Sequence, residues 1–482
     1  MTYRWMNALP VALLAFAVSA SAQAQEEGAA QPAEGGKNIT ALAPVSGGLT
    51  AEEVARRATA TSFELKAKEK AVAAAEAQVD QAMVNFFPRI VLTGRYTRLS
   101  KVEYPSLIPA DSPFADFLGD AASSFSFETP LDQWHTQAQL QVPISDYILR
   151  ISRGYAAASK NLKAKQLDEQ AQKLKTALDA KVAYYDWLRA RGSAEVAEQT
   201  LEQAKGHLGD VKQAFAVGAA SKADVLRVEA QVAQAEMLVE RMRNLARITE
   251  DRLRVMMHDT SGRPYTVGEN LEDEVVPVAQ VQDLEALREE AMSRRLEVKM
   301  IEESVGAVRE QAKIAKAGMW PSIAAFADAI YANPNSRIFP QQEKWDFTWD
   351  AGIQITWSPN DVFASSASGS SVDAQAAQLE AQRDVLLDGI RLEVLQSAQA
   401  LREALVAIET TQRGLEAAEE SYRVRRELFR NGRATTMEVT DAEMELLRAR
   451  LEALNARVDL RTANARLEHA LGRDVDREVS VR

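Results

Sequence analysis

Four short segments of the chain alternate apolar and polar residues, the period-two pattern of a β-strand with one apolar and one polar face. The clearest is segment 346–357, and the other three are 89–98, 134–142 and 323–331. A tilted strand of about 9 to 11 residues is long enough to cross an outer membrane. These segments therefore predict membrane strands, with the edge of a soluble β-sandwich as the alternative.

Tryptophan is concentrated in or beside these four segments. Five of the seven tryptophans of the chain lie there. Aromatic residues form girdles at both rims of a transmembrane barrel, where the ring can meet lipid and water together. We therefore assign these five residues to an aromatic girdle: Trp134, Trp320, Trp345, Trp349 and Trp357.

The stretches between and beside the strand segments favour long helices. No proline interrupts residues 144–263 or the chain after Pro359, and proline is the strongest helix breaker. Segment 147–215 therefore predicts a very long helix. Segments 49–87 and 283–320 each predict one unbroken helix that leads into a strand.

Two of the helical segments carry a coiled-coil pattern. Their apolar residues recur at alternating steps of three and four, which is the 3.5-residue period of a seam between supercoiled helices. The many alanines predict close helix axes, so we interpret both stripes as packing surfaces and not as binding sites. The stripes are Val225, Val228, Val232, Ala235, Val239, Met242, Ala246, Thr249, Leu253 and Met256, and then Val439, Ala442, Leu446, Ala449, Ala453, Ala456, Leu460, Ala463, Leu467 and Ala470.

The chain contains an internal duplication. Pro88 and Pro321 occupy the same place in the pattern 233 positions apart (321 − 88), and Gly218 and Gly432 do so 214 apart (432 − 218). Each half reads helix, strand, loop, strand, long helix, glycine turn and helix. A chance repeat would not keep these landmarks in order. The expected divisions are a first repeat at 49–270, a second repeat at 271–475 and a tail at 476–482.

The first 24 residues predict a secretory signal peptide. Arg4 precedes a short apolar stretch, and a run of small residues suitable for cleavage follows it. We expect cleavage after Ala24, with Ala22 as the alternative site, and a buried N-terminal helix is the alternative for the whole segment. Segment 25–48 is rich in Ala, Gly, Pro and Glu and predicts a flexible leader. The mature protein is therefore expected to be exported.

Composition and charge exclude several classes of function. The 57 Lys and Arg against 69 Asp and Glu leave a net charge of −12, which argues against nucleic-acid binding. The absence of cysteine rules out disulfides, thiolate metal sites, a cysteine nucleophile and lipidation on cysteine. The four histidines are scattered, and the chain has no glycine-rich phosphate loop or nucleophile elbow. We therefore expect no enzyme activity, no metal and no cofactor.

Four strands cannot close a barrel on their own. Open strand edges are not tolerated in lipid, because their backbone groups would lack hydrogen-bond partners. Three chains with four strands each would supply 12, an even number that suits an antiparallel outer-membrane barrel. The expected fold is therefore mainly α with a membrane β-barrel: a duplicated protomer that forms a trimeric 12-stranded barrel and a long periplasmic helical barrel.

Residues 49–475 resemble the TolC-like outer-membrane efflux proteins. The resemblance rests on the duplicated architecture, on both helix–proline–strand entries, and on two glycine turns followed by an acid, 217–226 and 431–439. It implies a passive outer-membrane exit duct of a tripartite efflux pump or type I secretion system, which works with a periplasmic adaptor protein and an inner-membrane pump. The turns would be the tips that dock to the adaptor, with simple helix-hairpin turns as the alternative: Val217, Gly218, Ala219, Asn431 and Gly432.

The same resemblance implies a narrow periplasmic entrance. Glu438 and Asp441 match positions that form acidic rings there, although a solvated helix surface is the alternative for both. Asp224 matches an acid of the first repeat that a tyrosine and an arginine engage in the closed entrance. Here Phe429 stands in place of the tyrosine, and Arg433 is displaced by one position from the arginine. The competing function for the whole chain is the periplasmic adaptor itself, which is also exported and also built on helical hairpins.

Overall fold

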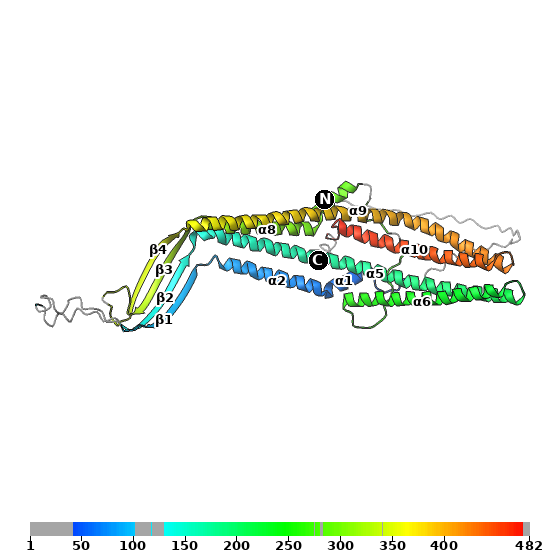
Figure 1. Ribbon diagram of the computed structural model, residues 1–482, viewed down its shortest axis with the longest axis horizontal. Coiled ribbons are helices and arrows are strands. Elements are labelled where there is room, and N and C mark those ends of the chain that lie inside the picture. The colour runs from blue at the N-terminus through cyan, green and yellow to red at the C-terminus, as the bar shows by residue number, and fades with distance from the viewer. Residues whose placement is uncertain are drawn as a thin grey trace, which may run out of the picture.

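The computed structural model describes residues 42–101, 117, 130–273, 275–279, 283–339 and 341–475. The predicted signal peptide, most of the predicted leader and the predicted tail at 476–482 lie outside the described residues. A four-stranded sheet stands at one end of the molecule, and long helices run away from it (Figure 1). In chain order the main elements are α1 (Ala51–Thr61), α2 (Phe63–Val84), β1 (Arg89–Arg98), β2 (Asp132–Val142), α4 (Ile144–Asp146), η3 (Tyr147–Ile151), α5 (Ser152–Ala216), α6 (Lys222–Met257), α7 (Leu284–Arg294), α8 (Leu296–Lys316), η4 (Ala317–Met319), β3 (Ser322–Asn333), β4 (Asp346–Thr356), α9 (Pro359–Arg430) and α10 (Thr436–Ala470).

The four predicted strands are confirmed, with ends that differ from the predictions by at most two residues. They form one antiparallel sheet in the order β1-β2-β3-β4. The register gathers apolar side chains on one face, since Leu140 of β2 lies between Ile90 and Ala327 of its neighbours. On the other face Gln139 pairs with Asp328, which pairs in turn with Asp350.

The apolar face of the sheet is uncovered in the single chain. Trp349 and Ile353 on this face are 70% and 69% exposed, and Ile90 and Leu92 are comparably exposed. No strand of the described residues pairs with the outer edge of β1 or of β4. The sheet therefore presents apolar side chains and two unpaired backbone edges to its surroundings.

The prediction of unbroken helices at 49–87 and 283–320 is wrong, because each segment is interrupted once. Ser62 separates α1 from α2 and Arg295 separates α7 from α8, with nearly equal backbone angles (φ −57°, ψ 125° and φ −58°, ψ 128°). The Ser62 hydroxyl accepts a hydrogen bond from the Leu65 amide and so starts a new helix. Arg295 is buried, and its guanidinium bonds Glu297 at 3.0 Å and Glu393 of α9 at 3.2 Å, which fixes the second break.

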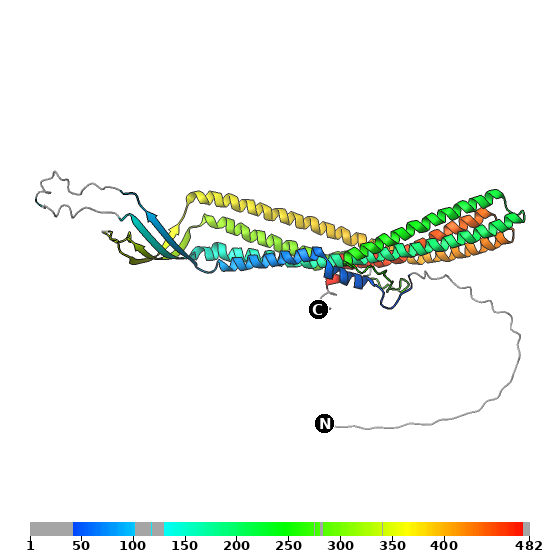
Figure 2. The same ribbon diagram turned by 90° about the horizontal axis from the view of Figure 1, so that it is seen from below.

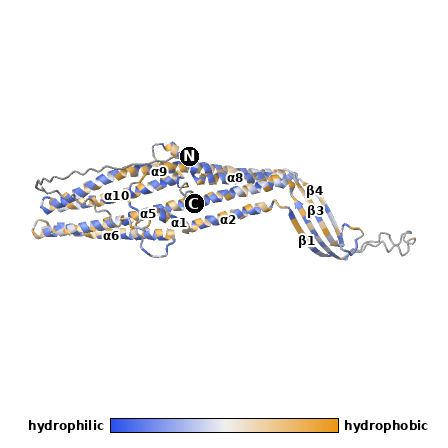
Figure 3. Ribbon diagram, turned by 180° about the vertical axis from the view of Figure 1, so that it is seen from behind, coloured by the Kyte–Doolittle hydropathy of each residue, from blue (hydrophilic) through white to orange (hydrophobic). Residues whose placement is uncertain are grey.

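The long helices agree more closely with their sequence pattern. The segment predicted as one helix at 147–215 is helical throughout, although its first turn, η3, is π-helical. All residues of the two predicted seams are buried or half-buried. Apolar and polar residues are interleaved along these helices (Figure 3). Among the described helices, none combines the length and the apolar character needed to cross a membrane.

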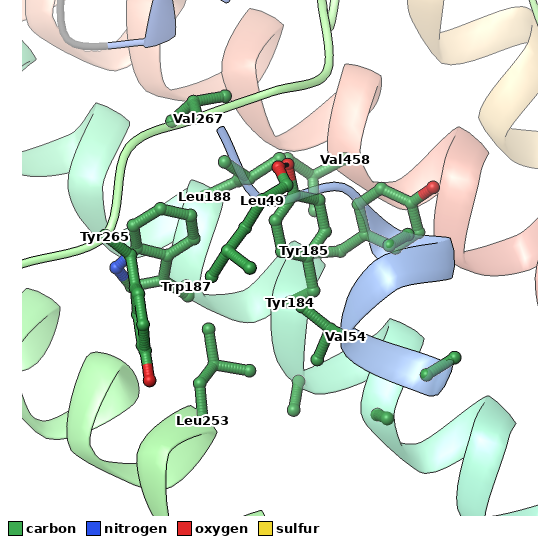
Figure 4. Close-up of a cluster of buried hydrophobic side chains, with 14 of the residues drawn as sticks. Leu49, Val54, Tyr184, Tyr185, Trp187, Leu188, Leu253, Tyr265, Val267 and Val458 are labelled. Carbon is green, nitrogen blue, oxygen red and sulfur yellow. Dashed lines mark hydrogen bonds between the residues drawn. The ribbon is translucent and has the colours of Figure 1, made fainter. Parts of the chain in front are cut away.

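The largest core lies in the middle of the molecule, where α1, α5 and α6 meet the segment that follows α6 (Figure 4). Trp187 and Tyr184 are fully buried there, and the Tyr184 hydroxyl donates a 2.7 Å hydrogen bond to the Leu49 carbonyl. Leu49 also joins the start of the chain to the later segment, because its amide donates to Thr266 and its carbonyl accepts from Gly268. Gly48 and Gly268 make this approach possible, since a Cβ on either would overlap the backbone of the other segment.

We predict that Gly268→Ala lowers stability by about 2 kcal/mol or more, because the added methyl group has no room and must displace backbone. Thermal unfolding followed by circular dichroism measures the effect. The control is Gly209→Ala on the exposed side of α5, where a Cβ meets no atom and alanine gains up to about 1 kcal/mol over glycine in a helix. Equal melting temperatures for Gly268→Ala and the unchanged protein would contradict this account of the core.

Candidate functional site: the two hairpin tips

Two long helical hairpins end together at the pole of the molecule that lies farthest from the sheet (Figures 1 and 2). The first hairpin is α5–α6 and the second is α9–α10. Their turns contain the residues that the sequence predicted as docking tips. The structure therefore brings the two predicted turns, far apart in the chain, to the same end.

The two turns have the same backbone geometry. Gly218 has φ +77° and Gly432 has φ +69°, in the left-handed region where a side chain is strained. In each turn the amide of the residue after the glycine donates a hydrogen bond to the carbonyl five residues earlier. The Ala219 amide bonds the Ala214 carbonyl and the Arg433 amide bonds the Leu428 carbonyl, both at 2.8 Å. This is the Schellman arrangement, which satisfies helix carbonyls that would otherwise lack partners.

Each turn is followed by a capping box that starts the next helix. The Ser221 hydroxyl accepts from the Asp224 amide, and the Asp224 carboxylate accepts from the Ser221 amide at 3.0 Å. Thr435 and Glu438 do the same in the second hairpin, with a 2.7 Å bond from the Thr435 amide to the Glu438 carboxylate. These hydrogen bonds hold the pKa of both carboxyls below the ordinary value, so both stay ionised at neutral pH.

The predicted docking residues are all exposed at the tips. Val217 is 80% exposed, and Gly218, Ala219, Asn431 and Gly432 are exposed as well. A Cβ built on either glycine meets no other atom. The turns are therefore compact in backbone, open to the outside and partly apolar.

The predicted entrance residues occupy different environments. Glu438 and Asp441 are both exposed near the start of α10, and the Glu438 carboxylate turns back onto its own helix end. Arg433 is exposed in the second turn. Asp224 belongs to the capping box of α6 and Phe429 has no hydroxyl, so the tyrosine–acid hydrogen bond implied by the resemblance has no counterpart here.

Phe429 instead packs between the two hairpins. It contacts the buried cluster of Val225 and Val228 in the first hairpin and that of Tyr422 and Val439 in the second. Its ring also meets the ring of buried His207 edge-on, with 5.3 Å between centroids. Phe429 therefore contributes to the apolar contact that joins the tips.

Sequence reasoning missed a buried polar cluster just behind the tips. Glu443 of α10 is only 2% exposed, and its carboxylate accepts a 2.8 Å hydrogen bond from the Gln231 amide group of α6. Burial raises the pKa of Glu443 to about 7. The only signal in the sequence was its position, four residues after Val439 and three before Leu446, which places it beside the predicted seam.

At the other end of the molecule, the five predicted girdle tryptophans are all well exposed and lie at both ends of the sheet. Trp320 and Trp357 flank the ends of β3 and β4 nearest the helices. Trp134 and Trp345 lie at the opposite end, where the Trp134 ring is tilted against Tyr96 and the Trp345 ring stacks on Tyr331. Trp349 lies within β4 close to that end. In the described residues, no group of three or more His, Cys, Asp or Glu side chains has an arrangement that could hold a metal ion.

Similarity to known structures extends over most of the chain. OprN, an outer-membrane channel, is 16% identical, with 88% of this chain and 89% of OprN covered and a TM-score of 0.73. VceC, an outer membrane protein of Vibrio cholerae, is 16% identical, with 88% and 96% covered and a TM-score of 0.70. MtrE, the outer membrane channel of Neisseria gonorrhoeae in its open state, is 14% identical, with 88% and 88% covered and a TM-score of 0.70. These similarities establish a shared fold.

Comparison at the level of sequence gives the family. No curated protein is similar enough in sequence to count as a match. The profile of the outer membrane efflux protein family matches residues 54–257 and 287–473, which together make up most of the chain. The chain therefore belongs to the outer membrane efflux protein family, a family of outer-membrane channels and not of enzymes.

Proposed function

We propose that this protein is a passive outer-membrane exit duct of a tripartite efflux or type I secretion system, and that its hairpin tips dock to a periplasmic adaptor protein. Transport energy would come from an inner-membrane pump on the other side of the adaptor. The protein would reach the outer membrane by a cleaved signal peptide at 1–24 and would not be lipidated, since it lacks cysteine.

The observation that carries the proposal is the sheet. Its apolar face is uncovered, and its outer strands β1 and β4 have no partner within the described chain. Pairing of β1 in one copy with β4 in the next would satisfy both edges, and three copies would give 3 × 4 = 12 strands in a closed barrel. The apolar face would then meet lipid, and the polar face with Gln139 and Asp328 would line the interior.

An internally duplicated protomer, with repeats at 49–270 and 271–475, suits such a ring. The offset of 233 positions that relates the two prolines also relates the helix breaks at Ser62 and Arg295 (295 − 62). The offset of 214 relates both the positive-φ glycines and the capping boxes (438 − 224). Each chain would then contribute two similar units, so that the trimer approaches sixfold regularity in its helical tube.

The alternative of a periplasmic adaptor has no support in these observations. Membership of the outer membrane efflux family points away from it, and both halves of the chain contribute two strands to a single sheet with an apolar face. The membrane face of that sheet is the feature that an adaptor would not need. A direct test of where this face lies therefore tests the whole proposal.

We predict that single cysteines at Leu140 or Ile353 react with lipid-phase reagents, whereas those at Gln139 or Gln354 react with aqueous reagents. The first pair lies on the apolar face of the sheet and the second on the polar face. The native chain has no cysteine, so each variant reports one site. Labelling of purified outer membranes measures which reagent reaches each site, and migration on mild gels shows whether the variant forms a trimer. Aqueous labelling at all four sites would overturn the barrel.

We predict that Gly218→Trp or Gly432→Trp leaves trimer assembly intact but reduces efflux at least about 10-fold, because a bulky side chain blocks the close approach of an adaptor backbone. The positive φ of both glycines adds strain, and the controls Gly218→Asn and Gly432→Asn separate the two effects, since asparagine tolerates this conformation. Dye efflux from cells that contain the adaptor and pump is the assay. Full efflux by both tryptophan variants would show that the tips are not the docking surface.

We predict that the double variant Glu438→Gln, Asp441→Asn weakens cation selectivity and relieves block by trivalent cations. Three copies of each carboxylate around one axis would concentrate cations at a narrow aperture. Glutamine at 438 can still accept the capping hydrogen bond, so the helix start is preserved while the charge is lost.

Single-channel recordings measure this effect, which should shrink in 1 M salt, where the screening length is about 3 Å. Glu409→Gln, on an exposed site of α9, is the control and should change neither selectivity nor block. Unchanged behaviour of the double variant would mean that both acids face the solvated outside of the tube.

A further inference from the structure

The buried carboxyl group of Glu443 joins the two hairpins behind their tips. Its Oε2 accepts the 2.8 Å hydrogen bond from Nε2 of Gln231 in α6. The Thr440 hydroxyl of α10 donates a 3.0 Å hydrogen bond to Oε1 of the same Gln231 side chain. Helix α6 packs mainly on α5, and α10 packs mainly on α9 and α5. Gln231 therefore provides a specific polar link between α6 and α10.

Some polar atoms beside this link have no hydrogen-bond partner. The Oε1 atom of Glu443 is buried and has no hydrogen-bond partner among the described residues, and the same is true of the Tyr422 hydroxyl of α9. A buried acceptor without a partner destabilises the folded state, and it does so more strongly when it is charged. The packed arrangement therefore tolerates a neutral Glu443 far better than an ionised one.

The corresponding glutamate of the first hairpin has a cationic partner that Glu443 lacks. At an offset of 214, Glu443 corresponds to Glu229 and Arg426 to Lys212. Glu229 and Lys212 form an ion pair at 3.1 Å near the surface. Arg426 instead reaches across to Asp210 of α5 at 3.3 Å, and Glu443 remains buried without it.

The charged and titratable groups around Glu443 come from three helices. Asp210 faces it from α5, and Tyr422 and Arg426 face it from α9, where Arg430 also pairs with Asp210 at 3.1 Å. His207 of α5 interacts with Asp210 and Arg426. Arg450 of α10 interacts with Tyr422 and pairs with Glu419 at 3.7 Å. Gln231, from α6, is uncharged.

We propose that Glu443 is a proton-linked latch between the two hairpins: its neutral carboxyl holds them packed together, and its ionised carboxylate favours a separated, hydrated arrangement. The inference goes beyond the proposed function, because it concerns regulation of the tips by pH. It requires no adaptor, pump or cargo.

The direction of the pH dependence follows from the two states. Burial raises the pKa of Glu443 from 4.5 to about 7, Asp210 acts in the same direction, and Gln231 and Arg426 oppose it. The packed state therefore binds the proton more tightly. The contribution of Glu443 to the stability of the packed hairpins is complete below about pH 4.5 and is lost as the pH rises through 7. Burial lowers the pKa of His207, which has the opposite effect, because its protonation disfavours the packed state as the pH falls below 6.5.

The experiment compares the protein with Glu443→Gln, which mimics the neutral carboxyl at every pH and leaves His207 in place. Hydrogen–deuterium exchange of peptides from 207–231 and 418–446 in the purified, full-length assembly gives the opening constant of each hairpin between pH 5 and 8. We expect the ratio of opening constants, unchanged protein over variant, to rise by up to about 100-fold over this range, since one pKa unit corresponds to a factor of ten. The effect of His207 cancels in this ratio.

Two further variants make the result specific. Glu229→Gln removes the corresponding, ion-paired glutamate and should leave the pH profile of the unchanged protein as it is. Gln231→Leu removes the hydrogen bond that lowers the pKa of Glu443 in the packed state, so the opening constant of this variant should keep rising to a higher pH and reach a larger total increase. A ratio that does not vary with pH, or an equal effect of Glu229→Gln, would overturn the latch, and neither outcome depends on whether the protein transports anything.

Discussion

Backbone hydrogen bonding along the outer strands β1 and β4 is the constraint on which the rest of the molecule depends. Each outer strand exposes a row of amide and carbonyl groups, and the face between them is apolar. An arrangement of this kind is unstable alone in water and inadmissible alone in lipid. The proposed association of copies through these edges would satisfy both requirements, and it would also fix where the helices stand, because α2 leads into β1 and α9 leaves β4.

The helices carry that constraint to the opposite pole along α5, which has 65 residues, and α9, which has 72 residues. The hairpins end in turns with the same backbone geometry but have different interiors. In the first, Lys212 and Glu229 pair at the surface; in the second, the matching cation crosses to Asp210 and leaves Glu443 buried. The two hairpins therefore share the backbone geometry of their turns but differ in their buried side chains. This difference allows polar contacts between the hairpins, such as Arg426 with Asp210 and Gln231 with Glu443.

The strands and seams could be predicted from sequence because each depends on a local period. Alternation over ten or so residues places every side chain of a strand on a face, so 89–98 was predicted to the residue. The helix breaks at Ser62 and Arg295 could not be predicted in this way, since neither residue is a helix breaker. Arg295 is held by Glu393, which lies 98 positions away in the chain. Glu443 was missed for the same reason, because its burial depends on Gln231 at 212 positions' distance.

Two glutamates five residues apart on α10 illustrate how position alone sets chemical behaviour. Glu438 lies at the helix start, where the Thr435 amide and hydroxyl stabilise its ionised form and lower its pKa. Glu443 lies one and a half turns further, where loss of water stabilises the neutral form and raises its pKa. Because the two shifts are opposite, the charge at the exposed tip stays constant through the neutral range while the charge between the hairpins changes within it. A change of pH can therefore act on the packing of the hairpins without altering the charge of Glu438 at their surface.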